Sequence, residues 1–113
     1  MEQYGTHHPA LLAALELMES HVADPLSVEQ LAGLAGISPR QLQRLFQQQL
    51  GRSAKRVYLD LRLAKADALL RQTRLAIPEV AAVCGFASAA HFARTLRAST
   101  GETPTRRRRA DRG

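Results

Sequence analysis

Apolar residues recur along most of the chain at the three- and four-residue spacing of amphipathic helices. The first such run contains Leu11, Leu15 and Met18 and predicts a helix over residues 8–23, which the Asp-Pro pair at 24–25 ends. No segment shows the regular alternation of apolar and polar residues that is typical of strands. The pattern therefore predicts an all-helical fold.

Capping and breaking residues divide the rest of the chain into further helices. Serines suited to the N-cap precede three of them, and glycines follow four. The predicted helices cover residues 28–34, 39–49, 54–72, 78–84 and 89–99. Beyond them, residues 103–113 are expected to hold one short helical turn and then to fray.

The helix predicted over residues 54–72 carries two apolar stripes. At about 100° per residue, one stripe consists of Val57, Leu61, Ala64 and Ala68, and the nearly opposite stripe of Leu59, Leu63, Ala66 and Leu70. A helix with two apolar faces must be packed on two sides, so we expect it to be a strut between two sub-bundles. A fully central helix is the alternative, but the charged residues between the stripes argue against it.

The segments that flank this helix resemble each other. Residues 27–36 read SVEQLAGLAG and match AIPEVAAVCG of residues 76–85 at an offset of 49, and residues 38–51 match residues 88–101 at an offset of 50. Each copy consists of a short helix, a glycine-containing turn and a second capped helix, which is the helix-turn-helix pattern. Two copies in register indicate a duplicated unit much more strongly than one copy would.

Charge is distributed unevenly along the chain. Residues 1–36 contain five acidic residues and no Lys or Arg, whereas residues 37–113 contain all 16 basic residues and five acidic ones. This basic region suggests a polyanionic partner, although ordinary surface solubility explains the charge by itself equally well.

The positions of the cysteine and histidine residues indicate whether a disulfide or a metal site is to be expected. Cys84 is the only cysteine, which excludes an internal disulfide, and its apolar helix predicts a buried structural thiol. His7 and His8 are adjacent and lack partners at metal-ligand spacing, so no metal or other cofactor is expected. Without a signal peptide or an apolar run of about 20 residues, the chain is expected to be soluble and cytoplasmic.

Three stretches together resemble the DNA-binding domain of the AraC/XylS family of transcription regulators. They are PLSVEQLAGLAGISPRQLQRLF (25–46), LRLAKADALL (61–70) and IPEVAAVCGFASAAHFARTLRASTGETP (77–104), and the resemblance covers about residues 8–105. The leading HPALLAALELMESHVADPLS resembles the junction in regulators that carry an amidase-like (DJ-1/PfpI-type) sensor domain upstream. A stand-alone regulator of this length is feasible, but this junction favours an excised domain of a larger regulator, whose effector-binding sensor domain is absent from the chain.

The resemblance implies an all-α, homeodomain-like fold of about seven helices in a DNA-binding domain over residues 6–113. Its expected parts are a first helix-turn-helix subdomain (8–52), a linker helix (54–72), a second subdomain (75–105) and a basic tail (106–113). Ala54 stands where the family usually has Pro, and arginines follow Pro104 where the family commonly has a Tyr.

The family's mechanism implies that two recognition helices enter successive major-groove segments of double-stranded DNA. Their centres should lie about one DNA turn, ~34 Å, apart, and a strut that held them closer would bend the duplex. The candidate base-contacting residues are Arg40, Gln41, Gln43 and Arg44 in the first helix and Ala89, Ala90, His91 and Arg94 in the second.

The chemistry of these candidates differs between the two helices. Arg and Gln can pair with guanine and adenine edges, although Arg44 is as compatible with a phosphate contact, and His91 with lying over Phe92. Ala89 and Ala90 offer only apolar contact, so the first unit is expected to carry most base specificity.

Phosphate contacts are expected from hydroxyls at helix N-termini and from nearby basic or polar residues. The candidates are Ser38, Lys55, Arg56, Ser88, Thr95 and Arg97. The run Arg106–Arg109 is either a further nonspecific DNA contact, which we favour slightly, or a solvated tail.

Other classes of function fit the sequence less well. An enzyme needs converging catalytic residues, and no catalytic site is apparent. A protein-interaction adaptor would not explain the paired basic helices, and the few aromatic residues offer no stacking platform for RNA. The acidic first helix is expected to be a solvated face, with a sensor domain or RNA polymerase as the alternative partners of that face. The isolated domain is expected to be monomeric. Activation and repression both fit.

Overall fold

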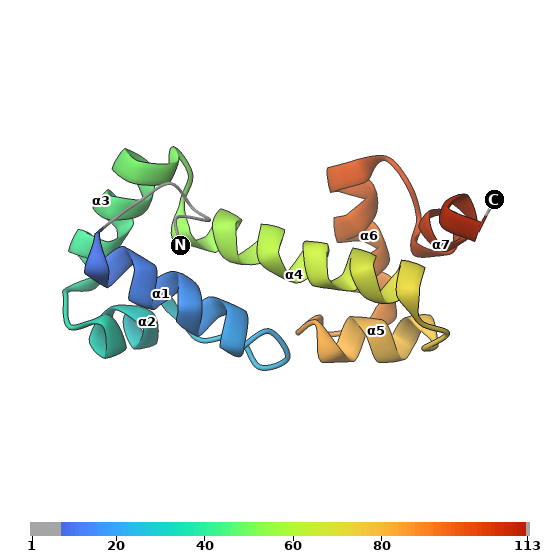
Figure 1. Cartoon of the computed structure of the whole chain (residues 1–113), viewed down its shortest axis with the longest axis horizontal. Coiled ribbons are helices and arrows are strands. Elements are labelled where there is room, and N and C mark those ends of the chain that lie inside the picture. Colours follow the sequence, from blue (N-terminus) through green and yellow to red (C-terminus); the bar gives the residue numbers. More distant parts are fainter. Residues whose placement is uncertain (1–7, 113) are drawn as a thin grey trace. The chain divides into compact units, whose positions relative to one another are not determined.

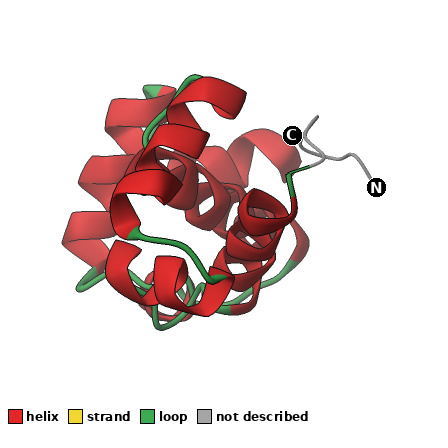
Figure 2. Cartoon of the chain, turned by 90° about the vertical axis from the view of Figure 1, so that its left-hand side faces the viewer, coloured by secondary structure: helices red, strands yellow, loops and turns green. Residues whose placement is uncertain are grey.

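The computed structural model describes residues 8–112, which form seven helices and no strand (Figures 1 and 2). They are α1 (Pro9–Ser20), α2 (Val28–Ala35), α3 (Pro39–Leu50), α4 (Ala54–Gln72), α5 (Ile77–Val83), α6 (Ala89–Thr100) and α7 (Pro104–Arg112). The all-helical prediction is therefore confirmed. Residue 6, at the expected start of the domain, and His7 lie outside the described residues. No helix within the described range is long and apolar enough to cross a membrane.

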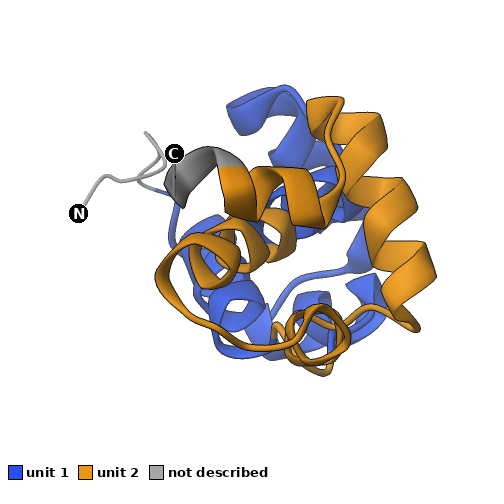
Figure 3. Cartoon of the chain, turned by 90° about the vertical axis from the view of Figure 1, so that its right-hand side faces the viewer, with its two compact units in different colours: residues 1–21, 25–61 blue, residues 22–24, 62–113 orange. Residues whose placement is uncertain are grey.

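The chain divides into two compact units (Figure 3). Unit 1 comprises the residues up to His21 together with Pro25–Leu61, and unit 2 comprises Val22–Asp24 together with the residues from Arg62 onward. The division falls inside α4, so the helix that the sequence predicts as a linker supplies its first half to one unit and its second half to the other.

Unit 1 is built around a buried cluster to which four helices contribute. Its members are Leu11, Ala14, Leu15 and Met18 of α1, Leu31 and Ala32 of α2, Leu42 and Phe46 of α3, and Ala54, Val57 and Tyr58 of α4. Unit 2 buries Leu63, Ala66 and Leu70 of α4 with Val80, Ala81, Cys84, Phe86, Phe92 and Leu96. Each predicted stripe of α4 is therefore buried in only one half of the helix, and Ala64, late in the first stripe, is exposed.

Tyr58 of α4 binds the backbone just beyond the end of α1. Its hydroxyl accepts a hydrogen bond from the Leu26 N–H at 3.0 Å and donates one to the His21 carbonyl. α1 stops at Ser20 instead of at the predicted residue 23, and the Tyr58 hydroxyl supplies a partner for the His21 carbonyl, which Pro25 could not provide within a continued helix.

The two helix-turn-helix turns have the same backbone structure, which confirms the internal repeat. Gly36 and Gly85 have φ angles of 81° and 82°, a left-handed conformation that favours glycine. The residue after each glycine donates a backbone hydrogen bond to the carbonyl five positions earlier, Ile37 to Ala32 at 3.0 Å and Phe86 to Ala81 at 2.9 Å. Each turn therefore closes onto the first helix of its own helix-turn-helix, α2 or α5.

The sequence predicted one short helical turn and then fraying, but the arginine run instead lies within α7, which extends to Arg112. Arg107 donates a hydrogen bond from Nε to Asp67 Oδ1 at 2.9 Å and forms an ion pair with the same oxygen, with Nη2 at 2.8 Å. Arg108 donates from Nε to the Leu70 carbonyl at 2.9 Å and from Nη2 to the Leu75 carbonyl at 2.7 Å. Hydrogen bonding to Asp67 raises the pKa of Arg107, which is the direction expected of a paired cation. These contacts with α4 and the residues after it hold the helix, so both arginines have a structural role.

Candidate nucleic-acid interface

In unit 1, α3 presents a polar face opposite its buried side. Ser38 caps the helix, Pro39 occupies its first position, and Leu42 and Phe46 are buried beneath it. At about 100° per residue, Arg44 projects directly away from these two residues. This exposed face has the composition expected of a surface that reads base edges.

All four candidate readers of α3 are exposed, and they share one helix. They are Arg40, Gln41, Gln43 and Arg44. Gln41 also has an internal role, because its Oε1 accepts a hydrogen bond from the Ser38 N–H at 3.0 Å while the Ser38 hydroxyl accepts one from the Gln41 N–H at 3.1 Å. This capping box fixes the first turn, so Gln41 would have to leave it to use its amide oxygen on a base.

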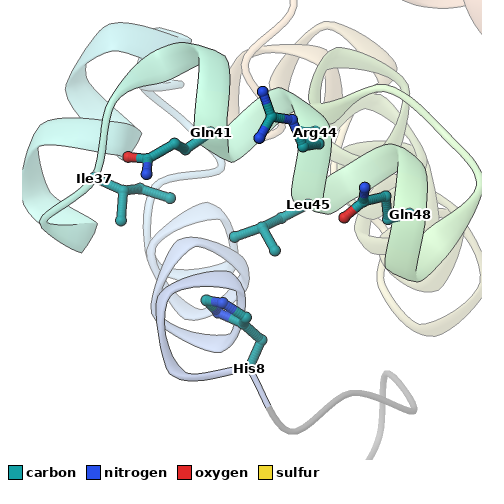
Figure 4. Close-up of a pocket in the computed structure, with 6 residues that line it drawn as sticks. All are labelled: His8, Ile37, Gln41, Arg44, Leu45 and Gln48. Carbon is teal, nitrogen blue, oxygen red and sulfur yellow. The ribbon is translucent and has the colours of Figure 1, made fainter.

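A pocket of about 220 Å³ opens beside α3 (Figure 4). Its lining residues are His8, Ile37, Gln41, Arg44, Leu45 and Gln48. Figure 4 shows Leu45 between α3 and His8, with the side chains of Arg44 and Gln48 further along the helix. The polar face of α3 therefore extends to its last turn, beyond the residues that the sequence singled out.

Gln47 and Gln48 are further exposed residues of α3 that the sequence prediction does not include. They lie one turn after Gln43 and Arg44 and continue the same face. The helical period places them on this face, whereas the predicted base-contacting residues all come from the first half of the helix.

In unit 2, α6 presents a corresponding face. Ser88 caps it by accepting a hydrogen bond from the His91 N–H at 3.0 Å, and Phe92 and Leu96 are buried. Arg94 projects away from these two residues, as Arg44 does in α3 at an offset of 50. Each helix-turn-helix therefore has an arginine at the centre of the exposed face of its second helix, α3 or α6.

The remaining α6 candidates offer less polar chemistry. Ala90 and His91 are exposed, whereas Ala89 is half-buried. The His91 ring lies edge-on to Phe86, with the ring centres 5.7 Å apart, whereas the sequence suggested Phe92 as its neighbour. Because His91 stays exposed in this position, a base contact remains compatible with it.

The candidate phosphate contacts fall into two groups. Lys55 and Arg97 are exposed cations, and Arg56 is also exposed but pairs with Asp60, with Nε 3.1 Å from Oδ1. Exposed pairs of this kind contribute only about 0–1 kcal/mol, so Arg56 can exchange its partner for a phosphate at little cost. Arg52, which the prediction did not include, pairs with the same carboxylate.

The hydroxyl groups among the phosphate candidates already form hydrogen bonds within their own helices. Ser38 and Ser88 accept hydrogen bonds as N-caps, which leaves their O–H groups as donors for a phosphate. Thr95 donates its hydroxyl to the His91 carbonyl at 2.8 Å, so a phosphate would compete with its own helix.

Cys84 is buried, as the sequence predicted, and burial raises the pKa of its thiol, an effect that Lys65 and Arg62 partly oppose. Because thiolate is the reactive form, we expect Cys84 of the folded protein to react with a disulfide reagent such as Ellman's reagent far more slowly than Cys84 of the chain unfolded in urea. The absorbance of the released thiolate at a mildly alkaline pH measures both rates. Equal rates would contradict the buried placement.

The chain matches the family model described as a helix-turn-helix domain over residues 31–110. It is 45% identical over 108 residues to the HTH-type transcriptional regulator GlxA of Rhizobium meliloti, covering 96% of this chain but 33% of that protein. The chain thus spans about a third of the length of this curated relative.

Solved structures show the same fold. A regulator with an AraC-type DNA-binding domain from Chromobacterium violaceum aligns with a TM-score of 0.87 and 42% identity, covering 91% of this chain and 92% of that one. The DNA-binding domain of AdpA, crystallised in complex with a target DNA, aligns with a TM-score of 0.86 and 28% identity, covering 93% of this chain and 95% of that one. The chain belongs to the AraC-type helix-turn-helix family, whose members are DNA-binding transcription regulators.

Proposed function

We propose that the chain binds double-stranded DNA in a sequence-specific manner and regulates transcription, with α3 and α6 as two recognition helices in successive major-groove segments. The observation that carries this proposal is the matched position of Arg44 and Arg94, each at the centre of the exposed face of a serine-capped second helix. An arginine so placed can pair with guanine O6 and N7.

The two units are proposed to contribute unequally. The exposed face of α3 carries several groups that can distinguish base pairs, those of Arg40, Gln43 and Arg44. We therefore assign most of the base specificity to unit 1. In α6 the alanines at 89 and 90 leave His91 and Arg94 as the polar readers. Unit 2 therefore acts mainly in positioning the protein on the duplex.

The continuous helix α4 is proposed to be the strut of this arrangement, because it joins the two units without a break over 19 residues. If it holds the recognition helices closer together than about one DNA turn, ~34 Å, the duplex would have to bend for both helices to enter its major groove.

Selection of bound duplexes from a random pool, repeated across salt concentrations, tests the proposed function. Two short motifs separated by about one DNA turn are the expected result, with the motif of unit 2 the weaker one. Enrichment of a single motif would contradict the use of two recognition helices, and no enrichment at all would contradict sequence-specific binding.

Replacing Lys55 with alanine is expected to weaken binding to all DNA sequences alike. Without one phosphate contact, binding releases one counterion fewer from the DNA. The magnitude of the slope of log affinity against log salt concentration should therefore fall by about 0.9. Fluorescence anisotropy with selected and scrambled duplexes measures this slope. Lys65→Ala is the matched control, because Lys65 is an exposed lysine of the same helix outside the proposed interface. A loss confined to the selected duplex would contradict the role of Lys55.

The chain is further proposed to act in the cytoplasm as the DNA-binding part of a longer sensor-regulator of the amidase-like subgroup. The supporting observations are the junction-like residues 8–27 and the relative GlxA, of which the chain covers a third. RNA polymerase is the proposed protein partner of the acidic α1.

The isolated domain is expected to sediment as a monomer, and a stable dimer at micromolar concentration would contradict this expectation.

A further inference from the structure

Arg62 binds the turn between the two helices of the second helix-turn-helix. Its Nε donates a hydrogen bond to the Cys84 carbonyl at 2.9 Å, and its Nη2 donates one to the Gly85 carbonyl at 2.7 Å. Carbonyls at the end of a helix have no partner within it, and a guanidinium can bond two of them in a fixed geometry. Arg62 therefore holds the backbone at the point where α5 ends and the turn begins.

The same guanidinium also contacts the aromatic group beside α6. Its central carbon lies 4.4 Å from the centre of the Phe86 ring, a distance typical of a cation–π interaction. Phe86 in turn packs against Phe92, with ring centres 5.1 Å apart, and against His91 in an edge-to-face arrangement. A continuous series of contacts thus leads from Arg62 to a candidate DNA-contacting residue.

The first turns of α3 and α6 differ in what holds the side chain at the third helical position. Gln41 and His91 occupy the same third position of their helices, and in α3 the capping box holds the Gln41 side chain. In α6, as the structure describes it, only the serine half of this arrangement is present. The side chain at the third position of α6 is instead in contact with Phe86, which Arg62 covers.

We propose that Arg62 is a positioning residue for DNA recognition by unit 2, fixing the turn before α6 and, through Phe86, the orientation of His91. This inference rests on the proposed function of α6 as a recognition helix. It means that base discrimination at the second half-site depends on a side chain of α4 that is occupied within the protein.

The test compares wild-type protein and Arg62→Gln on three duplexes, the selected one and two with either half-motif scrambled. We expect the variant to lose roughly fivefold or more of its discrimination at the second half-motif, the size of one base contact, and to keep discrimination at the first within about twofold. Lys65→Gln removes a charge from an exposed position of the same helix and should change neither value. Equal losses at both half-motifs would indicate a general structural role and overturn the proposal.

A lysine variant separates charge from geometry. Lysine keeps the positive charge but lacks the planar fork that bonds both carbonyls and covers the ring, so Arg62→Lys should not restore discrimination at the second half-motif. Full restoration would mean that charge alone matters and would overturn the proposal.

Coupling to His91 provides the second readout. If Arg62 acts through His91, the double variant Arg62→Gln/His91→Ala should discriminate the second half-motif no worse than His91→Ala alone. Additive losses would contradict this route. Should Arg62→Gln fail to fold, Phe86→Leu keeps an apolar side chain under the turn while removing the ring contacts, and the same pattern of loss is expected from it.

Failure of this inference is distinguishable from failure of the proposed function. Wild-type protein that discriminates neither half-motif would refute sequence-specific recognition itself. Wild-type protein that discriminates both, with Arg62→Gln and Phe86→Leu unchanged at the second, would refute only the role of Arg62.

Discussion

Replacing Arg44 with alanine should lower the affinity for the selected duplex about 5- to 150-fold, the loss expected from one bidentate base contact worth ~1–3 kcal/mol. The arginine lies at the centre of the exposed face of α3, opposite the buried Leu42 and Phe46. Its loss should relax the requirement for one or two base pairs in the first half-motif. Competition binding with duplexes mutated one position at a time measures this change.

The equivalent variant in unit 2 is the natural comparison. Arg94→Ala should cost less discrimination than Arg44→Ala, because we assign unit 2 mainly to positioning. If Arg44→Ala weakened binding to every duplex by the same factor, Arg44 would be a phosphate contact, and base reading by α3 would rest on Arg40 and Gln43.

The largest effect on stability is expected from Phe46→Ala. Phe46 is completely buried in the cluster of unit 1, and removal of a buried phenylalanine typically costs about 3–5 kcal/mol through lost burial and the cavity left behind. That is a large part of the roughly 5–15 kcal/mol by which domains are stable. Urea unfolding followed by circular dichroism measures the difference in the free energy of unfolding.

Leu34→Ala is the matched control for this variant. Leu34 is a large apolar residue of the same unit, but it is 65% exposed. Its replacement should change the free energy of unfolding by no more than about 0.5 kcal/mol. A change at Leu34 as large as that at Phe46 would mean that Leu34 is buried in the folded protein.

Local signals explain why so much of the fold could be predicted from the sequence. Ser27, Ser38 and Ser88 cap the helices that the sequence assigned to them, and α4 has the predicted bounds. Caps and left-handed glycines act within a few residues of themselves, so their consequences follow from adjacent sequence.

Features that depend on distant partners could not be predicted in the same way. Arg107 reads as part of a charged tail until Asp67, 40 residues away, is known to lie beside it. From the sequence, Arg62 is likewise one of several charged residues on α4. Its partners are two backbone carbonyls, and because every residue has a backbone carbonyl, no residue type in the sequence identifies them. For the candidate site, the helical period identified the exposed face of α3, but not that Gln41 is shared with the cap.

The exposed face of α3 has a consequence for how such a regulator can diverge. Its side chains at Arg40, Gln43, Arg44 and Gln47 are exposed and outside the buried cluster, which consists of other residues. Substitutions at these positions should therefore alter the preferred operator while leaving the folding free energy nearly untouched. A duplicated copy of such a gene could acquire new targets through single changes, each yielding a protein that still folds.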